Sequence, residues 1–260
     1  MRSAEGDLKR LPGLVTELIS EGAGVLLVVG SAAIKAATEV SQSIPIVGID
    51  LGVNPVRAGY VTSLRRPGGN VTGLFLNQPA IVGKWVDLLR DAQPSIGRLA
   101  FLSDSGTALD QVDAAKEVAA ARGCQSIVLD VRTVQDFDEV FRALGERPRT
   151  GIVQLAVSTY TVAQAQECAR AALKYMLPMI VPVKSFMKPG VLMSYGPIEE
   201  QYFPRAVVLA DRILRGERAG ELPIEGPDRF ELVLNMATAK QLQLNVPKSL
   251  HLRADQVIDS

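Results

Sequence analysis

Histidine, cysteine and tryptophan are scarce in this 260-residue chain, which holds one His, two Cys and one Trp. With His251 as the only histidine, the chain has no H-E-x-x-H zinc motif, and no Ser-His-Asp triad around a sharp nucleophile turn can be assigned. The sequence also lacks a G-x-x-x-x-G-K-[ST] phosphate loop and a G-x-G-x-x-G that follows a strand. We therefore predict no catalytic residue, no metal site and no cofactor.

The chain also has a net charge of zero, because its 28 Lys and Arg residues balance its 28 Asp and Glu residues. A neutral chain has no broad attraction for phosphate backbones or anionic headgroups, so we predict no nucleic-acid partner and no binding to membrane surfaces. Cys124 and Cys168 have no C-x-x-C spacing, and we interpret them as reduced, partly buried thiols. The sequence leaves a disulfide between them open.

Long apolar runs are missing too. The longest, residues 25–29 and 176–183, are far shorter than the roughly 20 residues that span a bilayer. Residues 1–10 are polar and do not have the layout of an export signal. We expect no insertion into the membrane, and a chain that begins in this way would stay in the cytoplasm.

Short runs of Val, Ile and Leu are present in plenty, and each is followed by a longer stretch with helical spacing. This alternation predicts an α/β fold with parallel sheets buried on both faces. The expected strands are residues 25–29, 44–49, 71–75, 99–103, 126–131, 151–157, 179–183, 191–194 and 230–234. The expected helices are residues 6–20, 32–41, 79–91, 108–122, 134–144, 162–175 and 199–215.

Pro94 and Gly97 interrupt the middle of the chain, and the same strand and helix rhythm runs on both sides of them. We therefore predict two similar α/β lobes. The first comprises residues 1–97 with about 196–227, and the second comprises residues 98–195 with about 228–260.

Small polar residues follow many of the expected strands. Open parallel sheets bind ligands at the carboxyl ends of their strands, where unpaired helix N–H groups point outward. Helix capping is the better explanation for each such residue when it is taken alone, and Asp50 alone is more typical of a turn, but the set as a whole indicates a cleft between two lobes. The candidate ligand-binding residues are Ser31, Ala32, Asp50, Asn77, Gln78, Ser105, Thr107, Ser158, Thr159, Ser185 and Tyr195.

Four segments taken together resemble one protein family. They are the stretch of residues 11–48 that begins LPGLVTELIS, RPGGNVTGLF at residues 66–75, GVLMSYGP at residues 190–197, and the ending that includes LRAD at residues 252–255. The family is that of ABC transporter substrate-binding proteins, in the branch that includes the tryptophan-binding type. The resemblance covers nearly the whole chain, from about Ala4 to Asp259.

The resemblance implies a type I periplasmic-binding fold, in which two doubly wound lobes joined by a hinge close around a small solute. It implies capture of a solute, an amino acid of the aromatic or another class, and its delivery to the membrane subunits of an ABC permease by a periplasmic monomer. It also implies that Ser31, Ala32, Asn77 and Gln78 contact the solute from one lobe, and that Ser105, Thr107, Ser158, Thr159 and Ser185 contact it from the other, with Tyr195 near a crossing segment.

Two departures from the family pattern bear on this interpretation. Family members carry a further strand, helix and strand ahead of the Ala4-Glu5-Gly6 segment, so we expect the first lobe to be incomplete. Asn54 stands where the family often has Asp, which removes a partner for a cationic group. Alternatives are a truncated or degenerate copy that binds no ligand, a small-molecule enzyme, and a sensor domain on the same kind of fold.

Overall fold

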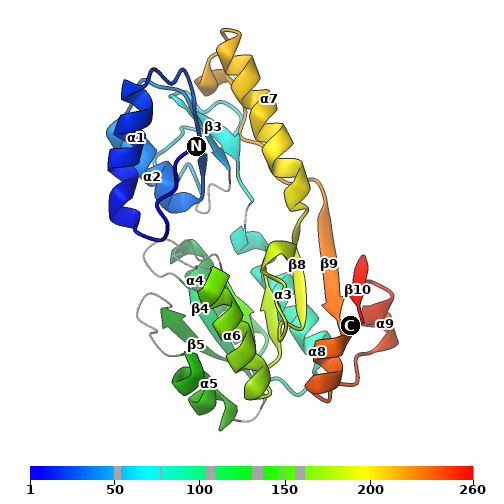
Figure 1. Ribbon diagram of the computed structural model, residues 1–260. Helices are drawn as coiled ribbons and strands as arrows, with labels where there is room; N and C mark the ends of the chain where they lie inside the picture. The colour runs from blue at the N-terminus through cyan, green and yellow to red at the C-terminus, as the bar shows by residue number, and fades with distance from the viewer. Residues whose placement is uncertain are drawn as a thin grey trace. The chain divides into compact units, whose positions relative to one another are not determined.

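The computed structural model describes residues 1–49, 54–76, 78–103, 109–130, 137–147, 149–155 and 162–259. The chain divides into two compact units (Figure 1). Unit 1 comprises Met1–Asn77 and Glu199–Asp228, and unit 2 comprises Gln78–Ile198 and Arg229–Ser260.

Unit 1 is built on a parallel sheet of three strands in the order β1-β2-β3. Helices α1 and α2 cover one face of the sheet, and α7 covers the other (Figure 1). Both faces are therefore apolar, as the continuous Val, Ile and Leu runs predict. The elements are η1 (Leu8–Arg10), α1 (Leu11–Ser20), β1 (Leu26–Val29), α2 (Ser31–Val40), β2 (Ile46–Ile49), β3 (Val71–Leu74), η3 (Glu199–Gln201), α7 (Tyr202–Leu214) and η4 (Ala219–Glu221).

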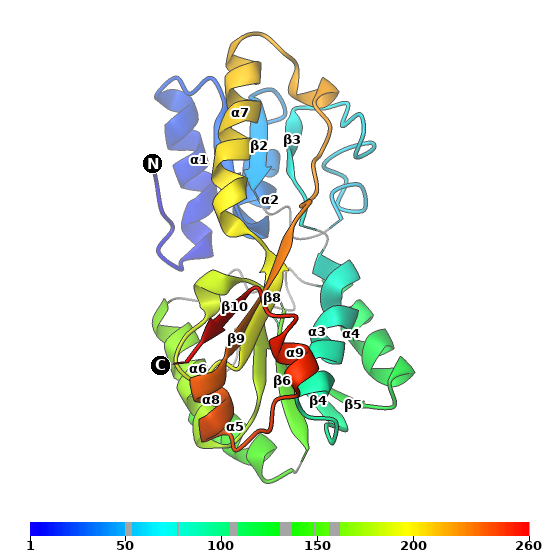
Figure 2. The ribbon, with the colours of Figure 1, turned by 90° about the vertical axis from the view of Figure 1, so that its right-hand side faces the viewer.

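Unit 2 has a sheet of seven strands in the order β10-β9-β8-β7-β6-β4-β5. Helices α3, α4, α8 and α9 contribute to the core on one face, and α5 and α6 cover the other (Figure 2). The elements are α3 (Gln78–Ala92), β4 (Arg98–Ser103), α4 (Leu109–Ala121), β5 (Gln125–Asp130), α5 (Phe137–Gly145), β6 (Thr150–Gln154), α6 (Val162–Lys174), β7 (Met179–Val181), η2 (Lys184–Phe186), β8 (Met193–Pro197), β9 (Phe230–Asn235), α8 (Met236–Gln241), α9 (Lys248–His251) and β10 (Gln256–Ile258).

The boundary between the units lies earlier than the sequence predicts. Helix α3, which we expected in the first lobe, packs in unit 2 against α4, β6 and β7. Its residues Trp85, Leu88 and Leu89 are fully buried in the same core as Leu99 and Phe101 of β4. Pro94 and Gly97 therefore turn the chain from a helix into its own sheet and do not separate two lobes.

Two features of the unit 2 sheet differ from the predicted all-parallel pattern. Strand β9 pairs with β8 in the antiparallel direction, and β10 then pairs with β9 in parallel. The three-residue strand β10 and the four-residue helix α9 were not predicted, because segments this short do not show a hydrophobic period. Asp255, directly ahead of β10, ties this edge strand to β9 by accepting a hydrogen bond from the backbone N–H of Leu232 at 2.8 Å.

The RPGGNVTGLF segment holds the unit 1 sheet together. The side-chain amide of Asn70 donates hydrogen bonds to the carbonyl oxygens of Ser41 and Ile44, at 3.1 and 2.8 Å. Gly73 has a φ of 138°, and a Cβ at this position would lie 2.0 Å from the carbonyl oxygen of Gly48 on β2. Only glycine fits there, so this family-like motif has a structural role in the sheet.

Candidate functional site

In unit 1, the junction of β1 and α2 forms the described part of the candidate site. The N–H of Gly30 donates a hydrogen bond of 2.9 Å to the carbonyl oxygen of Ile49. This bond ties the carboxyl end of β1 to that of β2. Helix α2 then begins at Ser31, with Gly30 as its N-cap at a φ of 85°. Helix capping was one explanation for Ser31 in the sequence. The structure does not support it, because Ser31 is already the first helical residue and no side chain makes the capping hydrogen bond.

The first turn of α2 is consequently suited to an anionic group. Ser31 and Ala32 are half-buried, and the first N–H groups of a helix have no partner within it. These N–H groups, together with the Ser31 hydroxyl, present hydrogen-bond donors beside the carboxyl end of a parallel strand. A carboxylate is the natural ligand for this arrangement.

The other unit 1 candidates are only partly placed. Asp50 and Asn77 lie outside the described residues. Gln78 begins α3 and therefore belongs to unit 2. At the carboxyl end of β3, a hollow of about 220 Å³ is lined by residues that include Leu76 and Arg205.

Arg205 in this hollow is already paired, because its guanidinium group makes two hydrogen bonds to the Glu225 carboxylate at 2.5 and 2.7 Å. The carboxylate raises the pKa of Arg205. The Arg205 charge in this hollow is therefore neutralised by Glu225.

In unit 2, four candidates fall outside the described residues: Ser105 and Thr107 after β4, and Ser158 and Thr159 after β6. The structure instead shows two polar residues that the sequence analysis passed over, at the ends of these same strands. Ser103 is the last residue of β4 and Gln154 is the last residue of β6, and they are 0% and 1% exposed.

The Ser103 hydroxyl and the side-chain N–H₂ group of Gln154 have no hydrogen-bond partner in the described part of the chain. Leaving such a buried group without a partner costs about 1–3 kcal/mol. Natural proteins rarely keep one without a reason, and a ligand or a water is a common reason. The signal available in the sequence was a polar residue at the end of an otherwise apolar strand.

A third buried polar group is Ser194 of β8, whose hydroxyl also has no partner among the described residues. The register pairs Val153 with Ile180, which sets Gln154 level with Val181, and Val181 in turn pairs with Ser194. Paired residues on adjacent strands point to the same face. Gln154 and Ser194 therefore flank Val181 in one row beneath the carboxyl edge of the sheet.

Tyr195, which we expected to follow its strand, lies in the middle of β8 and forms the centre of an aromatic group. Its ring stacks on Phe230 with the centroids 5.7 Å apart and the planes at 14°, and the Lys84 ammonium lies 5.8 Å from the ring centroid. The indole N–H of Trp85 donates to the backbone oxygen of Tyr195 at 2.6 Å. Burial, followed by the charge of Asp255, raises the pKa of Tyr195, so the phenol is neutral at physiological pH. Neither Phe230 nor Lys84 was singled out from the sequence.

Ser185 lies in η2, the short helical turn after β7, and its side chain is exposed. Its neighbour Lys184 forms an ion pair with Glu231 of β9 at 3.9 Å. This pair joins η2 to the start of β9, so Ser185 and the Tyr195 group both belong to the β7 to β9 part of the unit 2 carboxyl edge.

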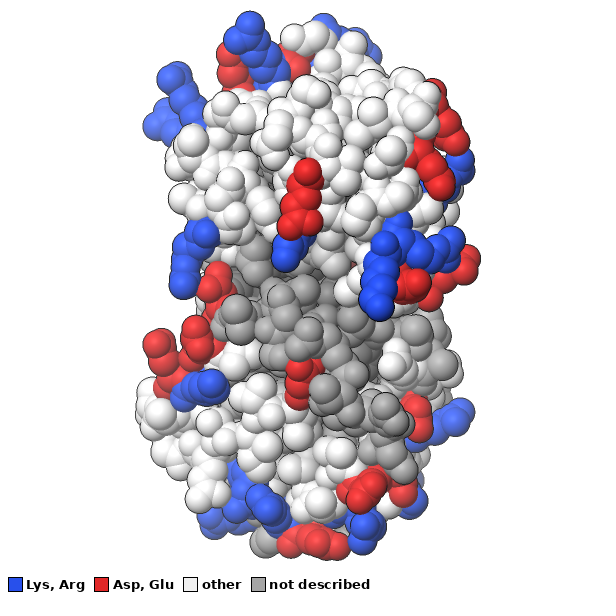
Figure 3. All heavy atoms as spheres, turned by 90° about the vertical axis from the view of Figure 1, so that its left-hand side faces the viewer, with Lys and Arg blue, Asp and Glu red and all other residues white. Residues whose placement is uncertain are grey.

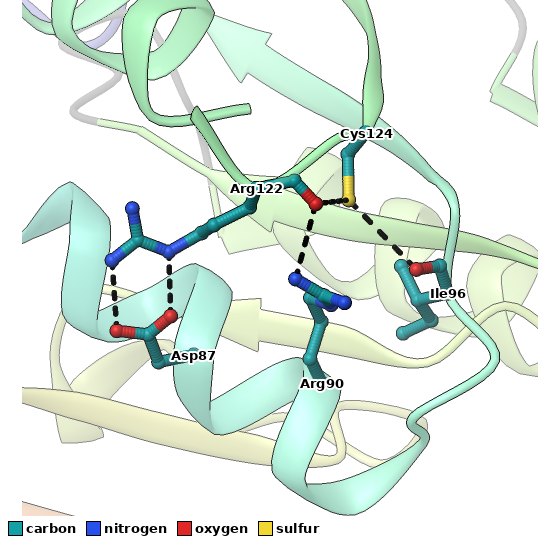
Figure 4. Close-up of polar contacts among 5 residues, drawn as sticks. All are labelled: Asp87, Arg90, Ile96, Arg122 and Cys124. Atoms are coloured by element: carbon teal, nitrogen blue, oxygen red, sulfur yellow. Dashed lines mark hydrogen bonds and ion pairs between the residues drawn. The ribbon is translucent and has the colours of Figure 1, made fainter. Parts of the chain in front are cut away.

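A larger hollow of about 500 Å³ lies elsewhere in unit 2, between the last turns of α3 and α9. Two of its acidic residues are paired: Asp87 accepts hydrogen bonds from Arg122 at 2.6 and 2.9 Å (Figure 4), and Asp91 accepts one from Arg253 at 2.7 Å. Arg90, which also lines the hollow, donates to the backbone oxygen of Arg122 at 3.2 Å. Cys124 and Cys168 are buried thiols that form no disulfide, and Cys124 lies beside the Arg122 backbone. Because α3 ends here just before β4 begins, the hollow adjoins the amino ends of the strands, where open α/β sheets do not usually bind ligands.

Charge and metal-binding chemistry add no further site. On the face drawn in Figure 3, acidic and basic side chains are interspersed and no extended patch of one sign forms. The described residues contain no group of three or more His, Cys, Asp or Glu side chains placed to hold a metal ion. Within the same part of the chain, no helix combines the length and the apolar character needed to cross a membrane.

Comparisons with known proteins agree with this architecture. Two solved structures superpose on nearly the whole chain. One is a conserved domain protein from Vibrio cholerae (24% identity, TM-score 0.88, 98% of this chain and 86% of that one). The other is an ABC domain from Streptococcus pneumoniae in complex with L-Trp (19% identity, TM-score 0.89, 99% and 86%). These similarities confirm the expected type I periplasmic-binding fold.

A curated relative and a family model extend the comparison to sequence. The tyrosine-binding protein of Clostridioides difficile strain R20291 is 21% identical over 245 residues, which is 94% of this chain and 70% of that protein. The model of the family described as ABC transporter substrate binding protein matches residues 1–258. Proteins of this family bind small solutes and work with ABC permeases, ordinarily outside the cytoplasmic membrane, and the family is not one of enzymes. With practically its whole length matched, the chain belongs to the ABC transporter substrate binding protein family.

Proposed function

We propose that this chain is a periplasmic solute receptor that captures an aromatic amino acid and delivers it to an ABC permease as a monomer. The match to the family model over residues 1–258 carries the proposal. The amino-acid class is supported by two relatives, of which one is a tyrosine-binding protein and the other was solved with L-Trp.

The described residues fit a zwitterionic aromatic solute. The first turn of α2, with Ser31 and the N–H groups that have no partner within the helix, would hold the carboxylate. The side-chain N–H₂ group of Gln154 would gain the partner that it lacks, and the stacked Tyr195 and Phe230 rings supply an aromatic surface. Asp50, Asn77, Gln78, Ser105, Thr107, Ser158, Thr159 and Ser185 remain proposed contacts.

Calorimetric titration tests both the solute class and the site. We expect L-Trp, L-Tyr or L-Phe to bind, and we expect tryptamine, which lacks the carboxylate, not to bind. Ser31→Leu should weaken binding at least tenfold, because the larger side chain blocks the first turn of α2. Ser249→Leu is the matched control, since Ser249 also lies in the first turn of a helix, α9, and is exposed.

Each arm of this experiment can fail separately. Binding of L-Trp that is equally tight in Ser31→Leu would reject α2 as part of the site. Equal binding of tryptamine and L-Trp would reject the carboxylate role. If no aromatic amino acid binds a chain that melts cooperatively, the proposed solute class is wrong.

A further inference from the structure

The chain crosses between its two units three times. From the bounds of the units, the crossings fall between residues 77 and 78, between 198 and 199, and between 228 and 229. Any movement of one unit against the other has to be absorbed by backbone rotations in these short segments. The contacts that hold the ends of the crossings therefore decide how the units move.

In unit 1, Glu225 joins the end of the third crossing to that of the first. Its backbone N–H donates to the carbonyl oxygen of Gly73 at 2.9 Å, and its own carbonyl oxygen accepts from the N–H of Phe75 at 2.8 Å. Gly73 belongs to β3, and Phe75 directly follows this strand on the way to the first crossing. The backbone just ahead of the third crossing is thus bonded to the backbone just ahead of the first.

Arg205 joins the same point to the second crossing. It lies in α7, the helix that follows this crossing after the short turn η3. Its guanidinium group makes two hydrogen bonds to the Glu225 carboxylate, and this two-pronged, charge-assisted geometry is the strong form of an ion pair. The Glu225 side chain is only 20% exposed, so water competes weakly for it. Glu225 therefore links the unit 1 ends of all three crossings.

In unit 2, a second cluster links the other ends. The bond from the Trp85 indole to the Tyr195 backbone ties α3, which begins at the first crossing, to β8, which leads into the second. The Tyr195 ring stacks on Phe230, directly after the third crossing. The N–H of Ile198 also donates to the carbonyl oxygen of Arg229 at 3.3 Å. These contacts hold the unit 2 ends together.

The two clusters differ in their support. The unit 2 cluster rests on the continuous antiparallel ladder between β8 and β9. Glu225, in contrast, pairs with β3 only as an isolated bridge. The hollow of about 220 Å³ opens beside it, and its lining includes Leu76, Gln201 and Asp228, each within three residues of a crossing. With space on this side, the Arg205 side chain is the contact that fixes Glu225 in place.

We propose that Arg205 is a positioning residue for solute capture. Through Glu225 it holds the unit 1 ends of the three crossings together, so that the segments between the two clusters bend as one hinge. Without it, the third crossing is released from β3, and the solute-free chain spreads over more arrangements. The apparent affinity for the solute falls with the fraction of chains that are competent to bind. This inference rests on the proposed function, and in it Arg205 acts through Glu225 without contacting the solute.

The test compares two arginines of the same helix. Arg205→Met removes both hydrogen bonds and retains an apolar stem. Arg212→Met is the matched control, because Arg212 of α7 makes the same two-pronged contact with Glu217, at 2.8 and 2.6 Å. Glu217 lies in the turn after α7 and belongs to no crossing. Both variants should therefore have similar melting temperatures. Glu225→Gln replaces Arg205→Met if the latter does not melt cooperatively.

The first measurement needs no solute. Arg65→Cys in unit 1 and Lys116→Cys in unit 2 provide exposed sites for spin labels, and the natural cysteines are buried. Pulsed electron resonance then gives the distribution of distances between the labels. We expect Arg205→Met to broaden this distribution about twofold and Arg212→Met to leave it unchanged.

Two further measurements follow the same pair of variants. Hydrogen exchange at the Phe75 amide should become at least tenfold faster in Arg205→Met and should not change in Arg212→Met. In calorimetric titration with L-Trp, Arg205→Met should weaken binding about fivefold, and the control should bind as the unchanged chain does.

The outcomes separate this inference from the proposed function. An unchanged distance distribution in Arg205→Met would overturn the inference, as would a broadened distribution with unchanged affinity for L-Trp. Equal effects of Arg205→Met and Arg212→Met would also overturn it, since they would reflect stability alone. If the unchanged chain binds no aromatic amino acid, the proposed function fails, and the distance and exchange measurements still decide whether Arg205 holds the hinge.

Discussion

The indole N–H of Trp85 reaches across unit 2 to the backbone oxygen of Tyr195, at 2.6 Å. This bond ties α3 to the middle of β8, where the Tyr195 ring stacks on Phe230. It also explains why a helix that we placed in the first lobe belongs to unit 2. The tryptophan is fully buried, so the hydrogen bond is made where water cannot replace it.

Trp85→Phe should therefore destabilise unit 2 by about 2 kcal/mol, from the loss of this hydrogen bond and from the space that the smaller ring leaves. Urea unfolding followed by circular dichroism measures the change. Phe101→Leu, a core replacement in the same cluster that breaks no hydrogen bond, is the comparison. If Trp85→Phe leaves the unfolding midpoint unchanged, the bond contributes nothing to stability.

Gly196→Ala should be more damaging than its size suggests. A Cβ at Gly196 would lie 1.7 Å from the carbonyl oxygen of Pro182, so β8 must move away from the end of β7. We expect a loss of about 2–4 kcal/mol and a disturbed Tyr195 environment.

The matched control for this change is Gly13→Ala, in helix α1, where no heavy atom lies within 4 Å of the new Cβ. This control should be neutral or should stabilise the chain by up to about 1 kcal/mol, because alanine favours a helix. Thermal melts compare the melting temperatures of Gly196→Ala and Gly13→Ala. Equal values would contradict the predicted clash between the new Cβ at Gly196 and the Pro182 carbonyl oxygen.

The ion pair of Asp87 and Arg122 should make the stability of unit 2 fall at acid pH (Figure 4). The hydrogen bond from Arg122 lowers the pKa of Asp87 in the folded chain. The stabilisation is therefore fully present above the ordinary pKa of an aspartate, about 4, and is lost as the pH falls through the lowered folded value. Both side chains are partly exposed, so we expect no more than about 1 kcal/mol.

Asp87→Asn should lower stability at pH 7, and the difference from the unchanged chain should shrink as the pH is taken below 4. Urea midpoints measured between pH 2 and pH 7 test this. Asp113→Asn, an exposed position on the neighbouring helix α4, should follow the unchanged chain at every pH. A difference for Asp87→Asn that stays constant with pH would contradict the role of its charge.

The sequence predicted the α/β class and most strands and helices, because apolar runs and helical spacing follow directly from burial on both faces of a sheet. It did not predict that β9 runs antiparallel to β8, since hydrophobic pattern carries no information on strand direction. The early unit boundary was missed for a similar reason. An amphipathic helix such as α3 shows that it covers a sheet, but it does not show which one.

Within the candidate site, the sequence singled out residues after the strands and passed over residues inside them. Ser31 begins α2 directly after β1, whereas Tyr195 lies within β8, because this strand continues to Pro197 and does not end at residue 194 as we expected. Ser103, Gln154 and Ser194 were missed because each sits in an apolar run and looks like ordinary strand sequence. Their lack of hydrogen-bond partners is a property of packing, which only the structure reveals.

Gln154→Leu separates a binding role from a structural one. Because the side-chain N–H₂ group of Gln154 is buried without a partner, an apolar side chain of similar size should raise the stability of the solute-free chain by about 1 kcal/mol. If Gln154 contacts the solute as proposed, the same change should weaken amino-acid binding at least tenfold.

Thr150→Val, at the other end of β6, is the control. The Thr150 hydroxyl donates to the Arg147 carbonyl oxygen at 2.7 Å, so loss of this bond should cost about 1 kcal/mol and leave the affinity for the amino acid unchanged. Thermal melts with and without L-Trp measure both effects, and a Gln154→Leu chain that is less stable yet binds normally would show that Gln154 serves the fold alone.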